Sequence, residues 1–252
     1  MGFASGVRSL FENKKPAAGR KIGRVHAIDL VRGGAIIAMV GYHMIVDLYT
    51  TGLISREALY NPVLNTVQEI ICCTFILASG ISCRFSRNNF RRGLVMLAAA
   101  AVVSLVSWIF SPDLFIVYGI LHFLGTAAIL WSLIGKLVDR LPEFVVPALC
   151  LPAAVLTGVF VSSRTFDVKY LWILGIRSPE FRSADYFPLM PYFFVYLIGV
   201  WAGTYIVQGR FPAWFYRISW KPLEFIGKHT IWIYMLHQPV CMGIAMLIKA
   251  LV

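Results

Sequence analysis

Apolar runs long enough to cross a bilayer recur along this chain and restrict it to one broad class of fold. A bilayer core about 30 Å thick needs roughly 20 apolar residues in a helix. Hydrophobic residues make up 59% of the chain and charged residues 14%, whereas a soluble domain has about 25% charged residues. The sequence therefore predicts an all-α fold, a polytopic transmembrane helix bundle of about seven spans, at roughly 29–48, 63–83, 93–110, 116–137, 143–161, 187–207 and 228–250.

The basic residues alternate in density between successive loops. With the N-terminus placed inside, the inner segments contain 16 of the 23 Lys and Arg residues and the outer segments contain six. Cytoplasmic loops of membrane proteins carry such an excess. We therefore expect a cytoplasmic N-terminus, an outer C-terminus, a basic cytoplasmic arm at 1–24 and one transmembrane domain at 25–252. The net charge of +11 is explained by this topology, and nucleic-acid binding is not expected.

The five cysteines lie in or beside apolar runs, without a CxxC motif and without metal-like spacing to histidine. They are typical of small packing residues. No metal site is predicted.

The first predicted span contains four ionisable residues, Asp29, Arg32, His43 and Asp47. An ionisable group inside a membrane helix costs about 3 kcal/mol and indicates a functional site by default. His43 and Asp47 share one helix face at i,i+4 spacing, so the carboxylate can orient or charge the imidazole. This pair is a predicted catalytic site near the outer side of the membrane.

Other polar residues are predicted at the same outer level. Glu69 is expected in the outer half of the second span, His122 near the outer end of the fourth, and Asp185 at the outer start of the sixth. His237 and Gln238 are expected in the middle of the last span. A purely structural role stays open for His122 and for His237. The connection 162–186 is expected to form a cap or a re-entrant element.

The inner side has a different composition. Arg32 is expected about 16 Å below His43, from eleven residues at about 1.5 Å each. Arg84, Lys228 and His229 are predicted near that level, with Asp29 and Glu224 as acidic partners. Such a cluster favours a phosphorylated ligand from the cytoplasm. Alternatively, Asp29 and Arg32 form an i,i+3 ion pair, and the basic residues Arg84, Arg87, Arg91 and Arg92 reflect topology alone.

Five segments in order resemble the bacterial members of the heparan-alpha-glucosaminide N-acetyltransferase-like family, within the wider transmembrane acyltransferase group. They are RVHAIDLVRGGAIIAMVGYHMIVDL at 24–48, FILASGISCRFS at 75–86, YGILHFLG at 118–125, DYFPLMPYFFVYLIGVWAG at 185–203 and FIGKHTIWIYMLHQPV at 225–240.

The resemblance implies acyl transfer from cytoplasmic acetyl-CoA to an acceptor on the far side of the membrane. The membrane histidine of the group corresponds to His43, and the D-x-x-R motif to Asp29 and Arg32. The lysosomal enzyme has more helices and a lumenal domain, so its acceptor specificity is not carried over. The resemblance also implies a bacterial cytoplasmic (inner) membrane location.

The residues and the resemblance together predict a transmembrane acyltransferase. Acetyl-CoA is the expected donor, and the expected acceptor is an amine or hydroxyl of an amino sugar, a glycan or a lipid-linked sugar. Direct base catalysis and an acyl-histidine relay both stay open, as does homo-oligomerisation. The alternatives are a proton-coupled transporter and a non-catalytic membrane subunit. The assigned roles are catalytic for His43, Asp47, His122 and His237, donor-binding for Asp29, Arg32, Arg84, Lys228 and His229, and acceptor-binding for Glu69, Asp185 and Gln238.

Overall fold

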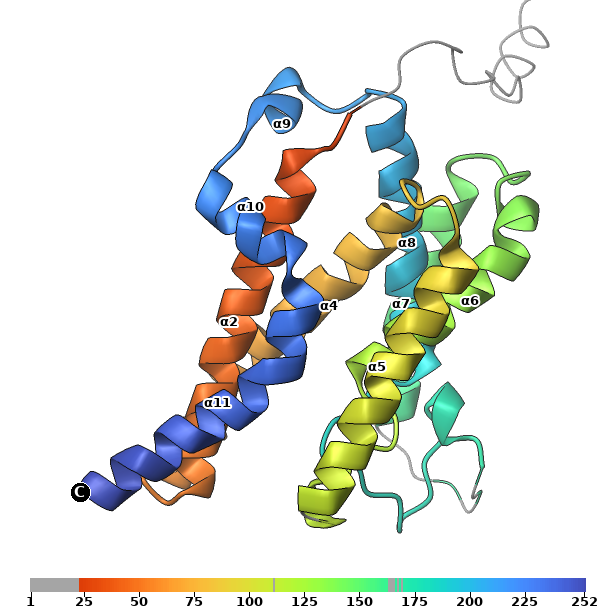
Figure 1. Ribbon diagram of the computed structural model, residues 1–252. Coiled ribbons are helices and arrows are strands. Elements are labelled where there is room, and N and C mark those ends of the chain that lie inside the picture. Colours follow the sequence, from red (N-terminus) through yellow and green to blue (C-terminus); the bar gives the residue numbers. More distant parts are fainter. Residues whose placement is uncertain (1–22, 111, 163–165, 167, 169) are drawn as a thin grey trace, which may run out of the picture.

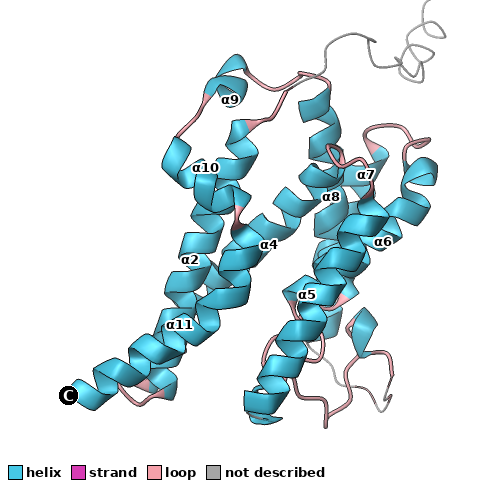
Figure 2. Ribbon diagram, viewed as in Figure 1, coloured by secondary structure: helices cyan, strands magenta, loops and turns pink. Residues whose placement is uncertain are grey.

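The computed structural model describes residues 23–110, 112–162, 166, 168 and 170–252. Within these ranges every regular element is a helix (Figures 1 and 2), so the predicted all-α fold is confirmed. Most of the predicted basic arm at 1–24 lies outside the described residues, as does part of the connection 162–186.

In the part of the chain that the structure describes, six helices are long and apolar enough to cross a membrane. They are α2 (His26–Thr50), α4 (Pro62–Cys83), α5 (Asn89–Phe110), α6 (Ile120–Val138), α8 (Leu189–Val207) and α11 (Thr230–Leu251). The fifth predicted span, 143–161, corresponds to α7 (Val145–Ser162), which has a shorter apolar stretch and continues through Pro152. The remaining short helices are α3 (Arg56–Leu59), η1 (Pro112–Leu114), η2 (Trp172–Leu174), α9 (Ala213–Arg217) and α10 (Lys221–Lys228).

Residues just before α4 and α6 determine where these two helices begin. α4 begins after Asn61, whose side chain accepts the N–H of Leu64 at 2.8 Å, and Pro62 occupies a first-turn position that needs no N–H. α6 begins at Ile120 and not at the predicted residue 116, because Gly119 is extended and Tyr118 forms an isolated parallel bridge with Tyr186.

α4 joins the two halves of the bundle (Figure 1). On one side it packs against α2, which in turn contacts α10 and α11. On the other side it packs along α8, which also contacts α7, while α5 packs on α6. Residues of α2, α4, α6 and α11 therefore face a common central region.

The α4–α8 contact depends on glycine. A Cβ added at Gly80 would lie 2.2 Å from the backbone oxygen of Tyr196, and one added at Gly199 would lie 2.4 Å from that of Leu77. Small residues let membrane helices approach this closely. Beside the crossing, the side chains of Ile76 and Tyr196 are fully buried.

We expect Gly80→Ala to destabilise the protein by about 3 kcal/mol, because a backbone atom of α8 must move to admit the methyl group. Thermal unfolding in detergent would show this as a lower melting temperature. Gly243→Ala is the matched control, since nothing lies within 4 Å of a Cβ at that helical position. Equal melting temperatures for the two variants would contradict the tight crossing.

Candidate functional site

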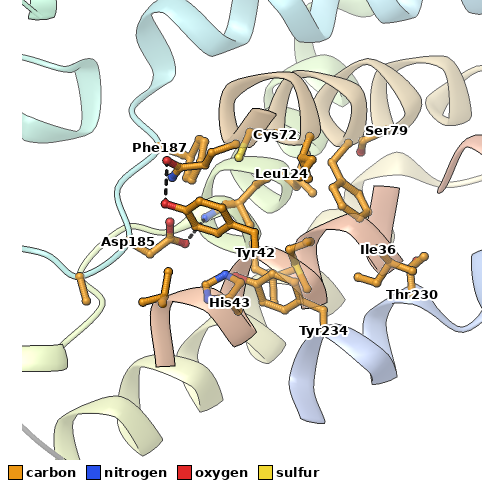
Figure 3. A pocket seen from close by; sticks show the side chains of 18 of the residues that line it. Ile36, Tyr42, His43, Cys72, Ser79, Leu124, Asp185, Phe187, Thr230 and Tyr234 are labelled. Carbon is orange, nitrogen blue, oxygen red and sulfur yellow. Dashed lines mark hydrogen bonds between the residues drawn. The ribbon is translucent and has the colours of Figure 1, made fainter. Parts of the chain in front are cut away.

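A cavity of about 350 Å³ lies in the central region of the bundle. α2, α3, α4, α5, α6, α11 and the segment before α8 all contribute to its lining. His43 and Asp185 lie toward one side of the cavity in Figure 3, and Ser79 and Thr230 toward the other. The polar lining residues include Arg32, Tyr42, His43, Asn65, Gln68, Ser79, Asp185, Thr230 and Tyr234. One cavity thus joins Arg32 to His43, which are about 16 Å apart along α2. The end at Arg32 is the predicted inner end of the cavity, and the end at His43 is the predicted outer end.

His43 lines this cavity and packs against a second histidine. Its ring centroid is 4.7 Å from that of His237 on α11, with an interplanar angle of 64°, and 5.8 Å from that of Tyr42. His237 is 8% exposed, and its Nδ1 lies 2.6 Å from the carbonyl oxygen of Tyr234. The structure therefore brings two of the predicted catalytic residues together.

Asp47 is not paired with His43, contrary to the expectation from their spacing. Its Oδ1 accepts the side-chain N–H of Gln238 at 2.8 Å, and no hydrogen bond to His43 is present among the described residues. Asp47 is 1% exposed, and its Oδ2 has no hydrogen-bond partner there. The i,i+4 spacing places both residues on one face, but the amide on α11 is the group within hydrogen-bond distance of the carboxylate. Gln238 thus lies beside Asp47 and is not a lining residue.

At the outer end of the cavity, Asp185 caps α6. Its Oδ2 accepts the backbone N–H of Ile120 at 3.1 Å, at a helix N-terminus that favours negative charge. Burial raises the pKa of Asp185 to about 6, although the backbone N–H groups of Ile120 and Tyr186 lower it in part. Nearby, Tyr42 donates to Gln68 at 3.0 Å. The outer end therefore combines a carboxyl group with neutral donors and acceptors.

Glu69 does not line the cavity. Its side chain is exposed and accepts the hydroxyl of Tyr192 at 3.3 Å. The predicted acceptor-binding role for Glu69 is therefore not supported by its position, whereas Gln68, one residue earlier, faces the cavity.

His122 has a structural position in place of the predicted catalytic one. Its Nδ1 accepts the backbone N–H of Gly119 at 3.2 Å, and its Nε2 lies 3.3 Å from the hydroxyl of Ser104. The Ser104 hydroxyl donates to the Ile116 carbonyl, so Nε2 is the donating nitrogen of His122. Nδ1 thus caps α6 and Nε2 joins α6 to α5, and His122 is not a cavity residue.

At the inner end, Arg32 has no ion pair or hydrogen bond among the described residues. Asp29, its expected partner, binds Arg24 instead, with Nε and Oδ2 2.6 Å apart. Arg92 on α5 is close enough to Arg32 for their like charges to interact. Arg92 donates to the hydroxyl of Ser79 at 2.6 Å, and its Nη1 is buried without a partner. Arg92 is not itself a lining residue, but it reaches the cavity through Ser79, which lines it together with Arg32. Among the described residues no unpaired carboxylate faces Arg32 here, an arrangement suited to an anion.

The other predicted inner residues are bound elsewhere. Arg84 forms a bidentate ion pair with Asp139 on the far side of α4, at 2.6 and 3.0 Å. Lys228 pairs with Glu224 at 3.4 Å, and His229 is exposed with its Nδ1 2.8 Å from the carbonyl oxygen of Phe225. Arg84, Lys228 and His229 are therefore absent from the cavity lining.

Lys228 lies outside the cavity because it pairs with the carboxylate of Glu224. Hydrogen bonds from Ser219 and His26, together with Lys228, lower the pKa of Glu224 to about 2. The buried carboxylate thus stays ionised and fastens α10 to the start of α2.

Arg92 and Ser79 are the main residues that the sequence prediction missed. Arg92 is the last basic residue before an apolar run, and that position could have separated it from loop arginines such as Arg87. The ASGIS segment that contains Ser79 was recognised only as a run of small residues. Tyr42, beside His43, lines the cavity as Ser79 does and had no predicted role.

The helices indicate an integral membrane protein, and a cavity lies inside its bundle. Residues 24–239 match the family described as heparan-alpha-glucosaminide N-acetyltransferase, catalytic, and the chain belongs to this family. Membership indicates a membrane acetyltransferase and does not favour the transporter alternative. No curated protein sequence and no solved structure matches the chain.

Proposed function

We propose that this protein transfers an acetyl group from cytoplasmic acetyl-CoA to an amine or hydroxyl group of a sugar on the extracytoplasmic side. The observation that carries the proposal is the single cavity that joins Arg32 to His43 within a member of an acetyltransferase family. The proposal includes a cytoplasmic N-terminus, supported by the basic inner loops, and a location in a bacterial cytoplasmic membrane.

The inner end of the cavity suits the donor. CoA carries a pyrophosphate and a 3′-phosphate, and arginine binds phosphate oxygens with two parallel N–H donors. Arg32 is free for this role because Asp29 is paired with Arg24. Nη1 of Arg92, which carries two N–H donors, has no partner among the described residues, and Ser79 lies beside this guanidinium group. In this proposal Arg32 and Arg92 bind the donor's phosphates, replacing the set of Arg84, Lys228 and His229.

The middle of the cavity is largely apolar. Ile36 and Met39 on α2 face Phe75 on α4 and Leu124 on α6. A flexible, mostly uncharged chain such as pantetheine fits between such residues. The donor's thioester would then reach the level of His43.

His43 is the proposed general base. It accepts the proton of the attacking N–H or O–H group while the new bond to the acetyl carbon forms and the carbon–sulfur bond breaks. The proton then passes to the departing sulfur, so that the products are the acetylated acceptor and the CoA thiol. An acyl-histidine at the same residue is the variant mechanism.

The outer end of the cavity supplies the proposed acceptor contacts. Asp185 can bind a hydroxyl or an ammonium group, and Gln68, Tyr42 and Asn65 offer further hydrogen bonds. Such a mixed set of neutral and acidic groups suits a sugar. Glu69 and His122 have no part in this scheme.

Purified protein in sealed vesicles tests the proposal. Acetyl-CoA is supplied on the face that carries the N-terminus, and glucosamine or a neutral glycoside is enclosed on the other. We expect acetylated sugar to accumulate inside while free CoA appears outside. Proton-coupled uptake of glucosamine without acetylation would contradict the proposal and support a transporter.

A further inference from the structure

The two ring nitrogens of His237 have different surroundings. Nδ1 lies 2.6 Å from the carbonyl oxygen of Tyr234, three residues earlier on α11. Because a carbonyl oxygen only accepts, Nδ1 carries the proton, and Nε2 of the neutral ring carries the lone pair. The backbone of α11 therefore fixes the tautomer of His237.

Nε2 of His237 is an acceptor that lacks a donor. It is buried and has no hydrogen-bond partner among the described residues. A buried acceptor left unpaired is costly, and in native proteins most such groups find a partner. The His43 ring, with its centroid 4.7 Å away, is a neighbouring side chain that can supply an N–H group.

The neighbouring pair keeps the two helices in register. Gln238, the residue after His237, donates to Asp47, the residue four positions after His43. Both members of this pair are on the same two helices as the histidines. The Asp47–Gln238 hydrogen bond therefore fixes α11 against α2 within one helical turn of His43.

We propose that His237 is a positioning residue for His43, and that its Nε2 accepts one N–H group of the His43 ring. The other nitrogen of His43 then has no proton and faces the cavity, as a general base requires. This inference deepens the proposed function and rests on it. It assigns the orienting role, expected for Asp47 on the same helix, to a residue of α11.

The proton count supports this arrangement. The acceptor's proton moves to the cavity-facing nitrogen of His43, and the resulting imidazolium remains hydrogen-bonded to Nε2 of His237. When the carbon–sulfur bond breaks, the same proton passes to the thiolate. His237 keeps its own proton on Nδ1 throughout, so no external proton donor is needed.

Three substitutions of His237 separate its two nitrogens. Asparagine keeps an N–H group near the position of Nδ1 but removes the acceptor at Nε2. Glutamine can place an amide oxygen near the position of Nε2, and phenylalanine keeps the ring volume without either nitrogen. We expect His237→Asn and His237→Phe to lower kcat for CoA release by about 10–100-fold, as for other residues that orient a functional histidine. The KM for acetyl-CoA should stay within about twofold, and His237→Gln should recover most of the lost kcat.

A purely structural role would give a different pattern. Equal losses of kcat in all three variants, or parallel losses of kcat and thermal stability, would overturn the proposal. Wild-type turnover by His237→Asn would do the same. Solid-state ¹⁵N NMR of histidine-labelled protein in bilayers reads the tautomers without turnover. In these spectra we expect a protonated Nδ1 on His237 and a His43 signal that changes in His237→Asn. An unchanged His43 signal would overturn the pairing, whether or not the protein releases CoA. A failure of the wild type to release CoA would instead contradict the proposed function.

Discussion

Replacing His43 with alanine is expected to lower kcat for acetyl transfer by about 10³-fold, within the range that general acid–base groups contribute. Among the described residues, His43 is the one histidine in the cavity lining, and His237 lies behind it. Release of CoA and formation of acetylated acceptor, measured in the same sample, would show the loss.

His229→Ala is the matched control for this variant. His229 is exposed and outside the cavity, so we expect kcat close to that of the wild type. His43→Ala should also keep its melting temperature within a few degrees, because His43 is only half-buried and lines the cavity. Near-normal turnover by a folded His43→Ala protein would contradict the assignment of His43 as the general base.

Loss of the inner arginines should weaken donor binding more than turnover. A charge-assisted hydrogen bond contributes about 1.5–3 kcal/mol, or roughly 10–150-fold in affinity. We therefore expect Arg32→Ala and Arg92→Ala each to raise the KM for acetyl-CoA by about that factor. Arg92→Lys should recover only part of the loss, since lysine has the charge without the planar pair of donors.

S-acetylpantetheine makes this test specific because it has the thioester but lacks the nucleotide and its phosphates. With this donor the wild type and both arginine variants should have similar KM values. Arg91→Ala controls for general charge at the same end of α5, since Arg91 is exposed and outside the cavity. The anion site would be excluded if Arg32→Ala raised the KM equally for both donors.

Much of the fold could be predicted from the sequence, because the length of each apolar run is a local property of the chain. Each of the predicted spans coincides with a helix in the structure, including the irregular 143–161. The errors concern helix ends, such as the start of α6, where the bridge between Tyr118 and Tyr186 keeps residues 116–119 out of the helix. That bridge joins segments far apart in the sequence, and no local pattern contains it.

The candidate site was predicted in part. Ionisable residues in an apolar helix stand out in any sequence, which is why His43 and Arg32 could be identified. The hydrogen-bond partners of the polar residues could not be identified, because spacing along a helix shows which face a residue lies on but not which side chain packs against that face. Asp47 bonds to Gln238, Asp29 to Arg24 and Arg84 to Asp139. In each case the observed partner lies outside the helical turn within which the sequence spacing predicted a partner.

The residues alone are enough to identify a bundle of membrane-spanning helices with costly polar groups in its first span. Those properties follow from the transfer of side chains from water to lipid, which depends on the residues alone. Which polar groups line or adjoin the cavity depends on the packing of helices that are distant in the sequence. The packing of the α2–α11 and α4–α8 pairs brings His237 against His43 and Arg92 against Ser79, and leaves His122 and Arg84 out of the cavity lining.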